Sequence, residues 1–361
     1  MTLIVATLVS LGASLQAGGA PAAQGPGSQP PPRDVVPTAS LLADAPTAVI
    51  RKDGLSLTVA LPDAQRGFYR STRFDWSGMV LFARIGTATF YGPWFDGVAE
   101  NVRDVWDGVD GVVVGPRNAA TGPAEEFANR DGETVPGYNA APAGGTFIKI
   151  GVGRLRKADA LPYDHFRGYQ IVDGGVWSIR RTADRIVFRQ RLEPDATGYG
   201  YVYEKTLTLT PGGGLTISHR LRNLGSKPIH TQIYTHNFAR FDGAEIGLGV
   251  TASFPYAPTG PVSEPALAMI DGNALKYVQP IPVGKRVQLP AQAGGQSRPS
   301  GPFEVVGANG ASIVMTGDTP LVRTVLWSMR RTVAVEPFVA IDVPVGAEQR
   351  WSWRYVYSAR R

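Results

Sequence analysis

The sequence predicts an all-β protein built as an antiparallel sandwich, and three observations support this prediction. Glycine (43) and proline (29) together make up a fifth of the 361 residues, against roughly 12% in an average protein, which disfavours long helices. The runs between these turn-formers are rich in Val, Thr, Tyr and Trp, the residues typical of strands. In 186–192 and 201–209 apolar and polar residues alternate, so each strand has one face that can be buried and one that stays in water.

The expected strands are separated by clusters of Gly, Pro, Asn and Asp. In order along the chain they are 55–61, 87–91, 146–152, 168–171, 176–180, 185–192, 199–210, 215–223, 229–238, 312–316, 321–327, 334–343 and 350–358. A short helix is expected at 98–106, and segments 97–145 and 257–301 are expected to be loops bordering a cleft.

The absence of cysteine excludes disulfides, thiolate nucleophiles and Cys-based metal sites. No parallel βαβ pattern is present, and glycines 212–214 form a hairpin turn rather than a phosphate loop, so no nucleotide cofactor is expected. The net charge is +6, but basic residues occur singly or in pairs, which argues against a nucleic-acid partner. Asp104, Asp107 and Asp110 lack EF-hand spacing, and we therefore predict no metal.

The N-terminal segment predicts export. An apolar run at 3–15 is too short to span a bilayer and is followed by small residues, which is typical of a secretory signal over 1–23, although no Lys or Arg precedes the run. A Pro- and Gly-rich linker is expected at 24–38, followed by one domain over 39–361. We expect a periplasmic or secreted protein with no membrane association after signal cleavage, and the sequence does not specify its oligomeric state.

Two residues are the best candidates for acid–base chemistry. His236 ends a strand-like run before Asp242 and Gly243, where an imidazole is well placed to face a cleft. Glu336 lies between apolar residues, and a carboxylate there is costly to bury unless it is paired or functional. The alternatives are a structural histidine and a solvated edge-strand glutamate beside Pro337.

These residues carry a family resemblance. The segment from Leu221 through Asn223 and Pro228 to Phe238, with His236 near its end, resembles the aldose 1-epimerase (galactose mutarotase) superfamily. The stretch 336–338 followed by 345–357 looks like that family's glutamate and final strand, and 150–155, with Arg154, is similar to its Gly-Arg segment near the sugar. The agreement covers about 60% of the chain, from Thr146 to the C-terminus.

The resemblance implies a large antiparallel β-supersandwich and an isomerase that interconverts sugar anomers. In this mechanism Glu336 is the base for the anomeric hydroxyl and His236 the acid for the ring oxygen, with no cofactor or metal. We expect the two side chains to converge on one cleft, a sugar ring apart. One departure from the family is that Asp173 stands where a second histidine is expected, and His165 lies nearby in a different context.

The N-terminal part of the chain offers a second candidate for sugar binding. Aromatic rings can stack on a sugar face while Arg and Asp bind hydroxyl groups, and the alternative is a strand and loop with a buried Trp. The candidates in this part are Arg70, Arg73, Asp75, Trp76 and Trp94. Glu125 and Glu126 are adjacent, so in an extended segment they point in opposite directions and at most one can face a site.

Three functions are consistent with the sequence, each with a mono- or oligosaccharide partner. The first is an exported epimerase-like isomerase. The second is a polysaccharide lyase or glycoside hydrolase on the same sandwich, favoured by the arginine surplus and the additional N-terminal part. The third is a non-catalytic carbohydrate-binding protein, favoured by the absence of the second histidine.

Overall fold

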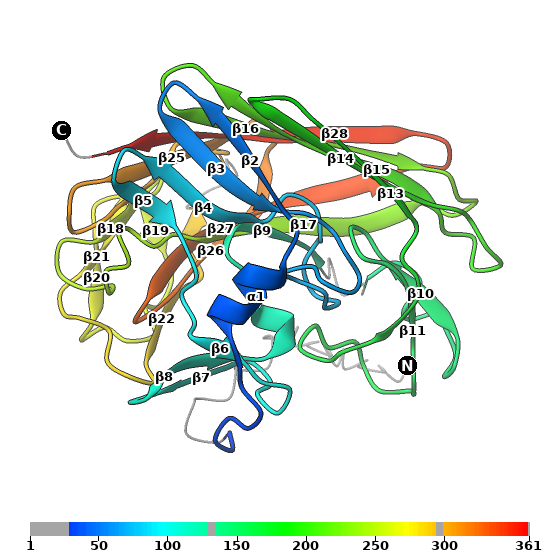
Figure 1. The fold of residues 1–361 in the computed structure, drawn as a ribbon, viewed down its shortest axis with the longest axis horizontal. Coiled ribbons are helices and arrows are strands. Elements are labelled where there is room, and N and C mark those ends of the chain that lie inside the picture. Colours follow the sequence, from blue (N-terminus) through cyan, green and yellow to red (C-terminus); the bar gives the residue numbers. More distant parts are fainter. Residues whose placement is uncertain (1–28, 129–134, 294–298, 360–361) are drawn as a thin grey trace, which may run out of the picture.

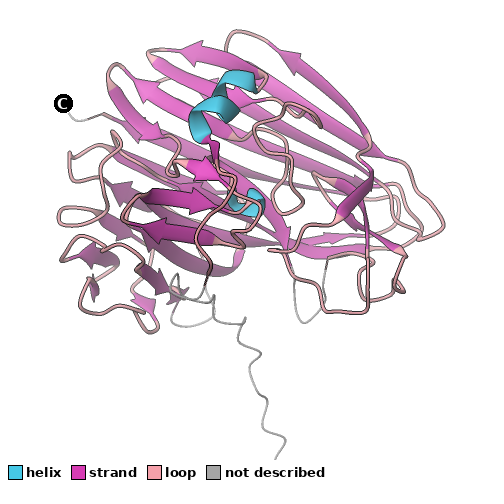
Figure 2. Ribbon diagram, turned by 60° about the horizontal axis from the view of Figure 1, so that its bottom comes forward, coloured by secondary structure: helices cyan, strands magenta, loops and turns pink. Residues whose placement is uncertain are grey.

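The computed structural model describes residues 29–128, 135–293 and 299–359. About 50% of the chain is strand and 3% helix, and Figure 2 shows strands throughout with little helix. The predicted all-β class is therefore confirmed. The expected signal at 1–23 lies outside the described residues.

The larger layer is a ten-stranded antiparallel sheet. Figure 1 shows its longest strands along the top of the molecule. In spatial order the strands are β13 (Val176–Arg181), β14 (Arg185–Leu192), β15 (Tyr201–Thr210), β16 (Gly214–Asn223), β28 (Glu348–Ser358), β25 (Ser312–Gly317), β24 (Phe303–Val306), β18 (Thr251–Ser253), β21 (Ala274–Tyr277) and β20 (Ala268–Asp271).

The second layer consists of two smaller antiparallel sheets. One contains β22 (Arg286–Leu289), β26 (Leu321–Met329), β27 (Thr332–Val343), β17 (Ile229–Phe238) and β9 (Gly122–Ala128). The other contains β2 (Thr47–Lys52), β3 (Leu55–Ala60), β4 (Val80–Ile85) and β5 (Ala88–Tyr91). At Gly122 a Cβ would lie 2.2 Å from the Val80 carbonyl oxygen, and φ is +59°. Only glycine allows β9 to approach β4 this closely.

The two layers enclose one large apolar core, and a second core covers the outer face of the five-stranded sheet. In β14, β15 and β16 the predicted alternation holds: the side chains that point inward are buried, whereas many that point outward are in contact with water. The second core contains Phe74, Trp94, Phe147 and Phe238. It is formed largely by the N-terminal part of the chain and by the segments around the sheet of β10 (Thr146–Lys149), β11 (Gly153–Arg156) and β12 (Gln170–Asp173).

Some local predictions were wrong. The expected helix at 98–106 is instead β6 (Gly97–Val98), a turn and the start of β7 (Val105–Gly108), because pairing of β6 with β1 (Val36–Pro37) and β8 (Gly111–Val114) outweighs a short helical pattern. The expected loop at 257–301 contains β19 (Pro258–Thr259), β20 to β22 and β23 (Gln292–Ala293). The helices within the described ranges are α1 (Thr38–Asp44) and the 3₁₀ turn η2 (Pro116–Asn118), neither of which was predicted.

A buried charge network crosses the space between the two layers. Lys205 of β15 donates to Asp75 (3.2 Å) and contacts Glu125 of β9 (2.5 Å). His219 Nε2 of β16 lies 2.8 Å from the same Glu125, and the Tyr203 hydroxyl donates to Asp75 (3.1 Å). Burial alone would raise the pKa of Glu125, but His219 and Lys205 hold it at about 2. Glu125 is therefore ionised. Burial raises the pKa of Asp75 against the opposing effect of Lys205, so both carboxylates depend on this shared cation.

Replacing Lys205 with methionine should strongly destabilise the protein, because Asp75 and Glu125 would lose their common cation inside the core. We expect the free energy of unfolding, measured by urea denaturation, to fall by about 3–5 kcal/mol. The matched control is Lys276→Met, which removes an exposed ion pair with Asp271 and should cost about 0–1 kcal/mol. Equal losses in the two variants would contradict this account of the network.

Candidate functional site

His236 and Glu336 face each other from neighbouring strands, β17 and β27, on the outer face of the five-stranded sheet. The pairs Tyr234–Phe338 and Ala239–Val333 share one register, which places His236 opposite Glu336. Pro337 has no backbone N–H, and the regular ladder stops beside it. Because β27 lies between β26 and β17, Glu336 is not on an edge strand. The proline marks an interruption in the sheet next to the pair.

The two side chains are in direct contact and nearly buried. His236 Nε2 lies 3.2 Å from Glu336 Oε1, with side-chain exposures of 7% and 10%. Burial raises the pKa of Glu336 to about 8, against the opposing effects of Arg73 and Arg323. Burial, assisted by Arg73, lowers the pKa of His236 well below its usual value. Near neutral pH the pair therefore consists of a carboxylic acid, which can donate a proton, and a neutral imidazole, which can accept one.

Aromatic rings surround His236. Phe238 stacks on the imidazole with ring centres 3.7 Å apart, and Trp94 stacks on the far side of Phe238 at 5.4 Å. Trp327 of β26 meets the imidazole edge-on at 5.2 Å, and Phe74 does so at 6.2 Å. These rings fix the plane of the imidazole and exclude water from it, which explains the low pKa of His236. Its Nδ1 is buried and has no hydrogen-bond partner among the described residues.

A charged cluster centred on Glu126 of β9 lies on the same face. Arg73 Nε and the Tyr234 hydroxyl donate to Glu126 Oε2 at 2.8 and 2.6 Å, while Lys149 Nζ donates to Oε1 at 3.0 Å. His165 Nδ1 lies 3.4 Å from the same Oε1. Burial opposes ionisation of Glu126, but Lys149, His165 and Arg73 hold its pKa well below the usual value. Glu126 is therefore an ionised anchor for the surrounding cations.

The cluster connects to the pair through aromatic contacts. The ring of Tyr234 lies 6.3 Å from that of His236 and stacks on Phe338 at 4.5 Å. Exposed Arg323 of β26 covers the other side of this group, with its guanidinium 3.9 Å from the centre of the Phe338 ring. Of the basic side chains named here, Arg323 is exposed and His165 is 35% exposed.

The structure separates the expected N-terminal sugar-binding residues. Arg73 joins the Glu126 cluster, whereas Asp75, two residues later, belongs to the network between the layers. The indole of Trp76 donates to the Ser71 carbonyl at 2.8 Å, and that of buried Trp94 donates to the Ala120 carbonyl at 2.9 Å. Trp94 therefore packs against Phe238, which stacks on His236. Its indole N–H already donates a hydrogen bond within the protein.

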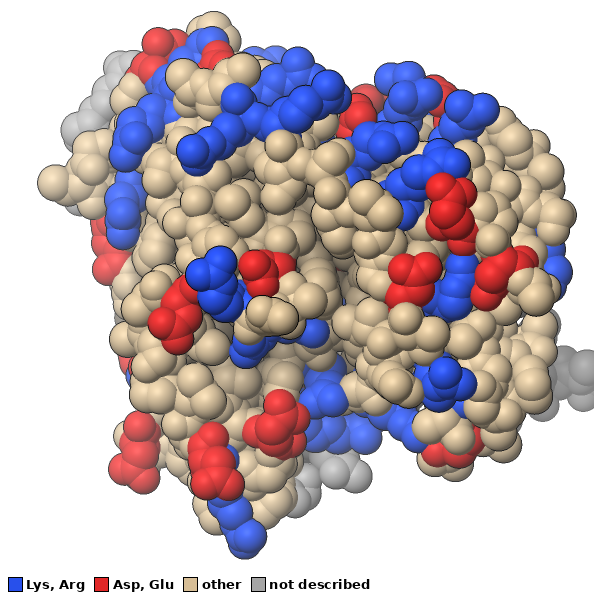
Figure 3. Space-filling view, turned by 45° about the vertical axis from the view of Figure 1, so that its right-hand side comes forward, with Lys and Arg blue, Asp and Glu red and all other residues tan. Residues whose placement is uncertain are grey.

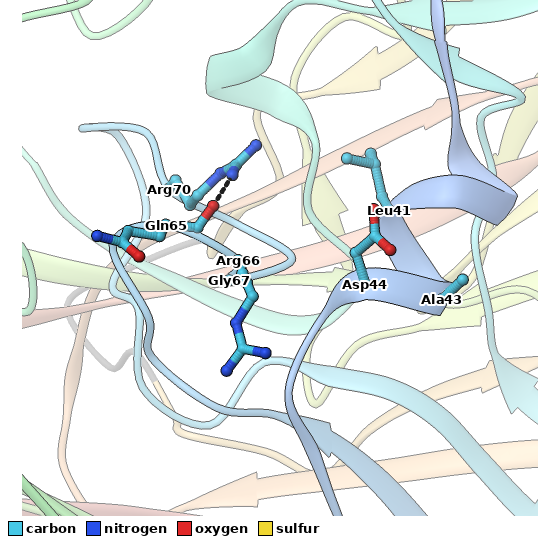
Figure 4. Close-up of a pocket in the computed structure, with 7 residues that line it drawn as sticks. All are labelled: Leu41, Ala43, Asp44, Gln65, Arg66, Gly67 and Arg70. Carbon is cyan, nitrogen blue, oxygen red and sulfur yellow. Dashed lines mark hydrogen bonds between the residues drawn. The ribbon is translucent and has the colours of Figure 1, made fainter.

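Arg70 lies at a separate hollow. Figure 4 shows it bonded to the carbonyl of Gln65, facing α1 across a cavity of about 450 Å³. The residues lining this cavity are Leu41, Ala43, Asp44, Gln65, Arg66, Gly67 and Arg70, which include no member of the His236–Glu336 pair.

The side chains of Arg154 and Asp173 also have partners outside the His236–Glu336 pair and the Glu126 cluster. Arg154 of β11 makes an ion pair with Asp195 at 2.8 Å and donates to the Glu193 carbonyl at 2.7 Å. Asp173 ends β12, is exposed, and accepts a hydrogen bond from the Gly175 N–H at 2.8 Å. The histidine that approaches the cluster is His165, from the loop before β12.

Several site residues were not predicted as such: Glu126, Lys149, Tyr234, Phe238, Trp327 and Arg323. Tyr234 and Phe238 had a detectable signal, since they flank His236 at a spacing of two on the same strand face. Glu126 was identified only as one of two alternating carboxylates. Lys149, Trp327 and Arg323 had no local signal, because long-range contacts bring them here. Strand β26 pairs with β27, and Lys149 reaches Glu126 from a separate sheet.

The described ranges contain no group of three or more His, Cys, Asp or Glu side chains arranged to hold a metal ion. In the same ranges, no helix is both long and apolar enough to cross a membrane.

The pKa of Glu336 predicts a pH-dependent loss of stability. Between about pH 4.5 and pH 8 the unfolded chain has ionised this carboxyl while the folded protein retains the proton, so stability falls as pH rises through this window. Glutamine cannot ionise. Urea denaturation should therefore show Glu336→Gln gaining stability relative to wild type as the pH rises from about 5 to about 8. The exposed Glu348→Gln, whose carboxyl has a lowered pKa, should show no such gain, and parallel curves for all three proteins would refute the assignment.

No protein-family model matches the chain, and no curated protein matches it. Solved structures similar to the chain are found at low sequence identity. A galactose mutarotase related enzyme from Lactobacillus acidophilus is 8% identical over 87% of this chain and 98% of its own, with a TM-score of 0.49. An aldose epimerase homologue from C. elegans is 10% identical over 88% of this chain and 100% of its own, with a TM-score of 0.46. A galactose mutarotase-like protein from Lactobacillus casei is 12% identical over 87% of this chain and 100% of its own, with a TM-score of 0.44.

Proposed function

We propose that this protein is an exported, carbohydrate-active isomerase of the aldose 1-epimerase type, in which His236 and Glu336 interconvert the anomers of a sugar. One observation carries the proposal: the two side chains form a nearly buried pair of one proton donor, Glu336, and one proton acceptor, His236. Mutarotation needs one group to accept a proton and another to donate one at the same time. Burial places the pKa of Glu336 above that of His236, so near neutral pH the pair contains one group that can donate a proton and one that can accept it.

The pKa values favour a resting state in which Glu336 is the acid. The neutral imidazole of His236 takes the proton of the anomeric hydroxyl while Glu336 donates its proton to the ring oxygen. The bond between C1 and the ring oxygen breaks as the C1 carbonyl forms. After rotation about C1–C2 the ring oxygen attacks the other face of the carbonyl, its proton returns to Glu336, and His236 returns a proton to O1. Relative to the roles implied by the family resemblance, acid and base are exchanged in the first half of the turnover.

The spacing of the pair is smaller than expected but compatible with this chemistry. The sequence led us to expect a separation of about one sugar ring, whereas the nitrogen and oxygen are 3.2 Å apart. The anomeric and ring oxygens are both bonded to C1, so two neighbouring groups can serve them from one side. The Phe238, Trp94 and Trp327 rings hold the imidazole in place, which limits the reorganisation needed during reaction.

Removing either member of the pair should abolish most of the activity. We expect Glu336→Gln and His236→Asn to slow α/β interconversion of aldoses by about 10²-fold or more, the usual contribution of a positioned acid or base. Polarimetry or NMR with several aldoses measures the rate, and Glu348→Gln on the other sheet is the control. The epimerase proposal fails if wild type accelerates no aldose above the uncatalysed rate.

The pH profile provides an independent check. The epimerase kcat/KM should fall as pH rises through about 8, where Glu336 loses its proton. It should persist below pH 6.5, because burial keeps His236 neutral there. A rate that drops on acidification near the usual histidine pKa would indicate a different base.

A second candidate is non-catalytic carbohydrate binding, favoured by the direct contact within the pair and by its low exposure. In that case wild type would bind sugars without accelerating mutarotation. Lyase or hydrolase activity would instead release unsaturated products or new reducing ends from polysaccharides. The raised pKa of Tyr234, caused chiefly by burial, makes this tyrosine a poor base for elimination.

A further inference from the structure

The outer face of the ten-stranded sheet carries a cluster of arginines, in the layer opposite to the His236–Glu336 pair. Arg189 and Arg191 of β14 point outward because the residues between and beside them point into the core, and Arg220 and Arg222 of β16 do the same. Strand β15 runs between these two strands. A shallow hollow of about 100 Å³ lies among them, lined by Arg189, Arg191, Arg220, Arg222, Val202 and Leu224.

The strand register arranges these arginines in two rows. Val202 lies between Arg191 and Arg222, and Glu204 lies between Arg189 and Arg220. Adjacent strands are about 4.8 Å apart, so the arginines of one row originate about 10 Å from each other. The second row continues into β28, where Arg350 is opposite Arg220. This spacing suits a ligand that carries repeated negative charges along its length.

The arginines of the cluster outnumber the carboxylates that pair with them. Glu348 is shared by Arg220 and Arg350, and Arg191 pairs with Glu193. Neither the Arg189 side chain nor the Arg222 side chain makes a hydrogen bond or ion pair with any residue in the described ranges. Figure 3 shows Lys and Arg side chains gathered along the upper margin of the molecule, with fewer Asp and Glu among them. This face therefore has unused capacity to bind an anion.

We propose that this arginine face binds an acidic polysaccharide, a chain of sugars carrying carboxylate groups. Guanidinium groups bind carboxylates through paired hydrogen bonds, and the hydroxyls of Thr216 and Ser218 beside the cluster can bind sugar hydroxyls. Glu204 within the cluster opposes the dense charge of a phosphodiester backbone. The outward side chains of β14, β15 and β16 include no aromatic ring on which a base could stack. The surface would hold the protein on its polymer independently of the chemistry at His236 and Glu336.

Binding of the full-length protein to polygalacturonate tests this proposal, with dextran as the neutral polymer and a thymidine oligonucleotide as the alternative polyanion. We expect binding to polygalacturonate that weakens steeply with salt, and no binding to dextran. The double variant Arg189→Gln/Arg222→Gln should weaken binding about tenfold or more, because it removes the two arginines without partners. The control Arg51→Gln/Arg84→Gln removes the same net charge from exposed positions on β2 and β4 and should change binding by less than about twofold.

Equal weakening in the two double variants, no binding to polygalacturonate at low salt, or tighter binding to the oligonucleotide would overturn the proposal. Thermal unfolding of each variant verifies that it is folded, and if the double variant unfolds, Arg222→Gln alone at its exposed position gives the same comparison. Glu336→Gln should retain full binding to polygalacturonate. This outcome separates the arginine face from the proposed isomerase, because either can fail while the other stands.

Discussion

The structure depends on ion pairs that compensate the charge of two adjacent carboxylates buried on strand β9. Glu125 and Glu126 are both almost fully buried, and an unpaired carboxylate in such a place would cost several kcal/mol. Because consecutive strand residues point to opposite faces, each carboxylate needs its own set of cations. Glu125 is paired with Lys205 and His219 in the interior, and Glu126 with Arg73 and Lys149 on the outer face. One strand thereby ties the two layers together and anchors the candidate site.

Burial also determines the chemistry of the site, but there it keeps a carboxyl group protonated. Glu336 makes no ion pair with a Lys or Arg of the described residues, and burial raises its pKa to about 8. Glu126 remains ionised next to Arg73 and Lys149. Arg73 also helps to keep His236 neutral. The cluster around Glu126 therefore supplies fixed charge, and the pair beside it supplies a mobile proton. This division of roles between neighbouring ionisable groups is typical of acid–base sites.

The two faces of the sandwich are suited to different tasks. The outer face of the five-stranded sheet is covered by the second core, which gives His236 its aromatic surroundings. The outer face of the ten-stranded sheet is uncovered at β14 to β16 and presents arginines at regular intervals. A protein with this division could hold a polymer on one side and act on a sugar on the other.

The sequence by itself determined the all-β class, the limits of the long strands and the choice of His236 and Glu336. These follow from local patterns, namely turn-former content, alternation with period two and an isolated carboxylate in an apolar strand. Strands β14 and β17 have the predicted boundaries. Local patterns were insufficient at 98–106, where pairing with distant strands decided the conformation.

Only the tertiary structure decided which charged residues meet. Arg73 and Asp75 are two positions apart and were expected to act together, yet they belong to networks on opposite sides of a strand. Arginines that are scattered along the chain as 189, 191, 220 and 222 form one cluster because β14 and β16 flank β15. The pKa values of His236 and Glu336 depend on how completely other segments bury them. Contacts and desolvation arise from long-range packing, which no local pattern encodes.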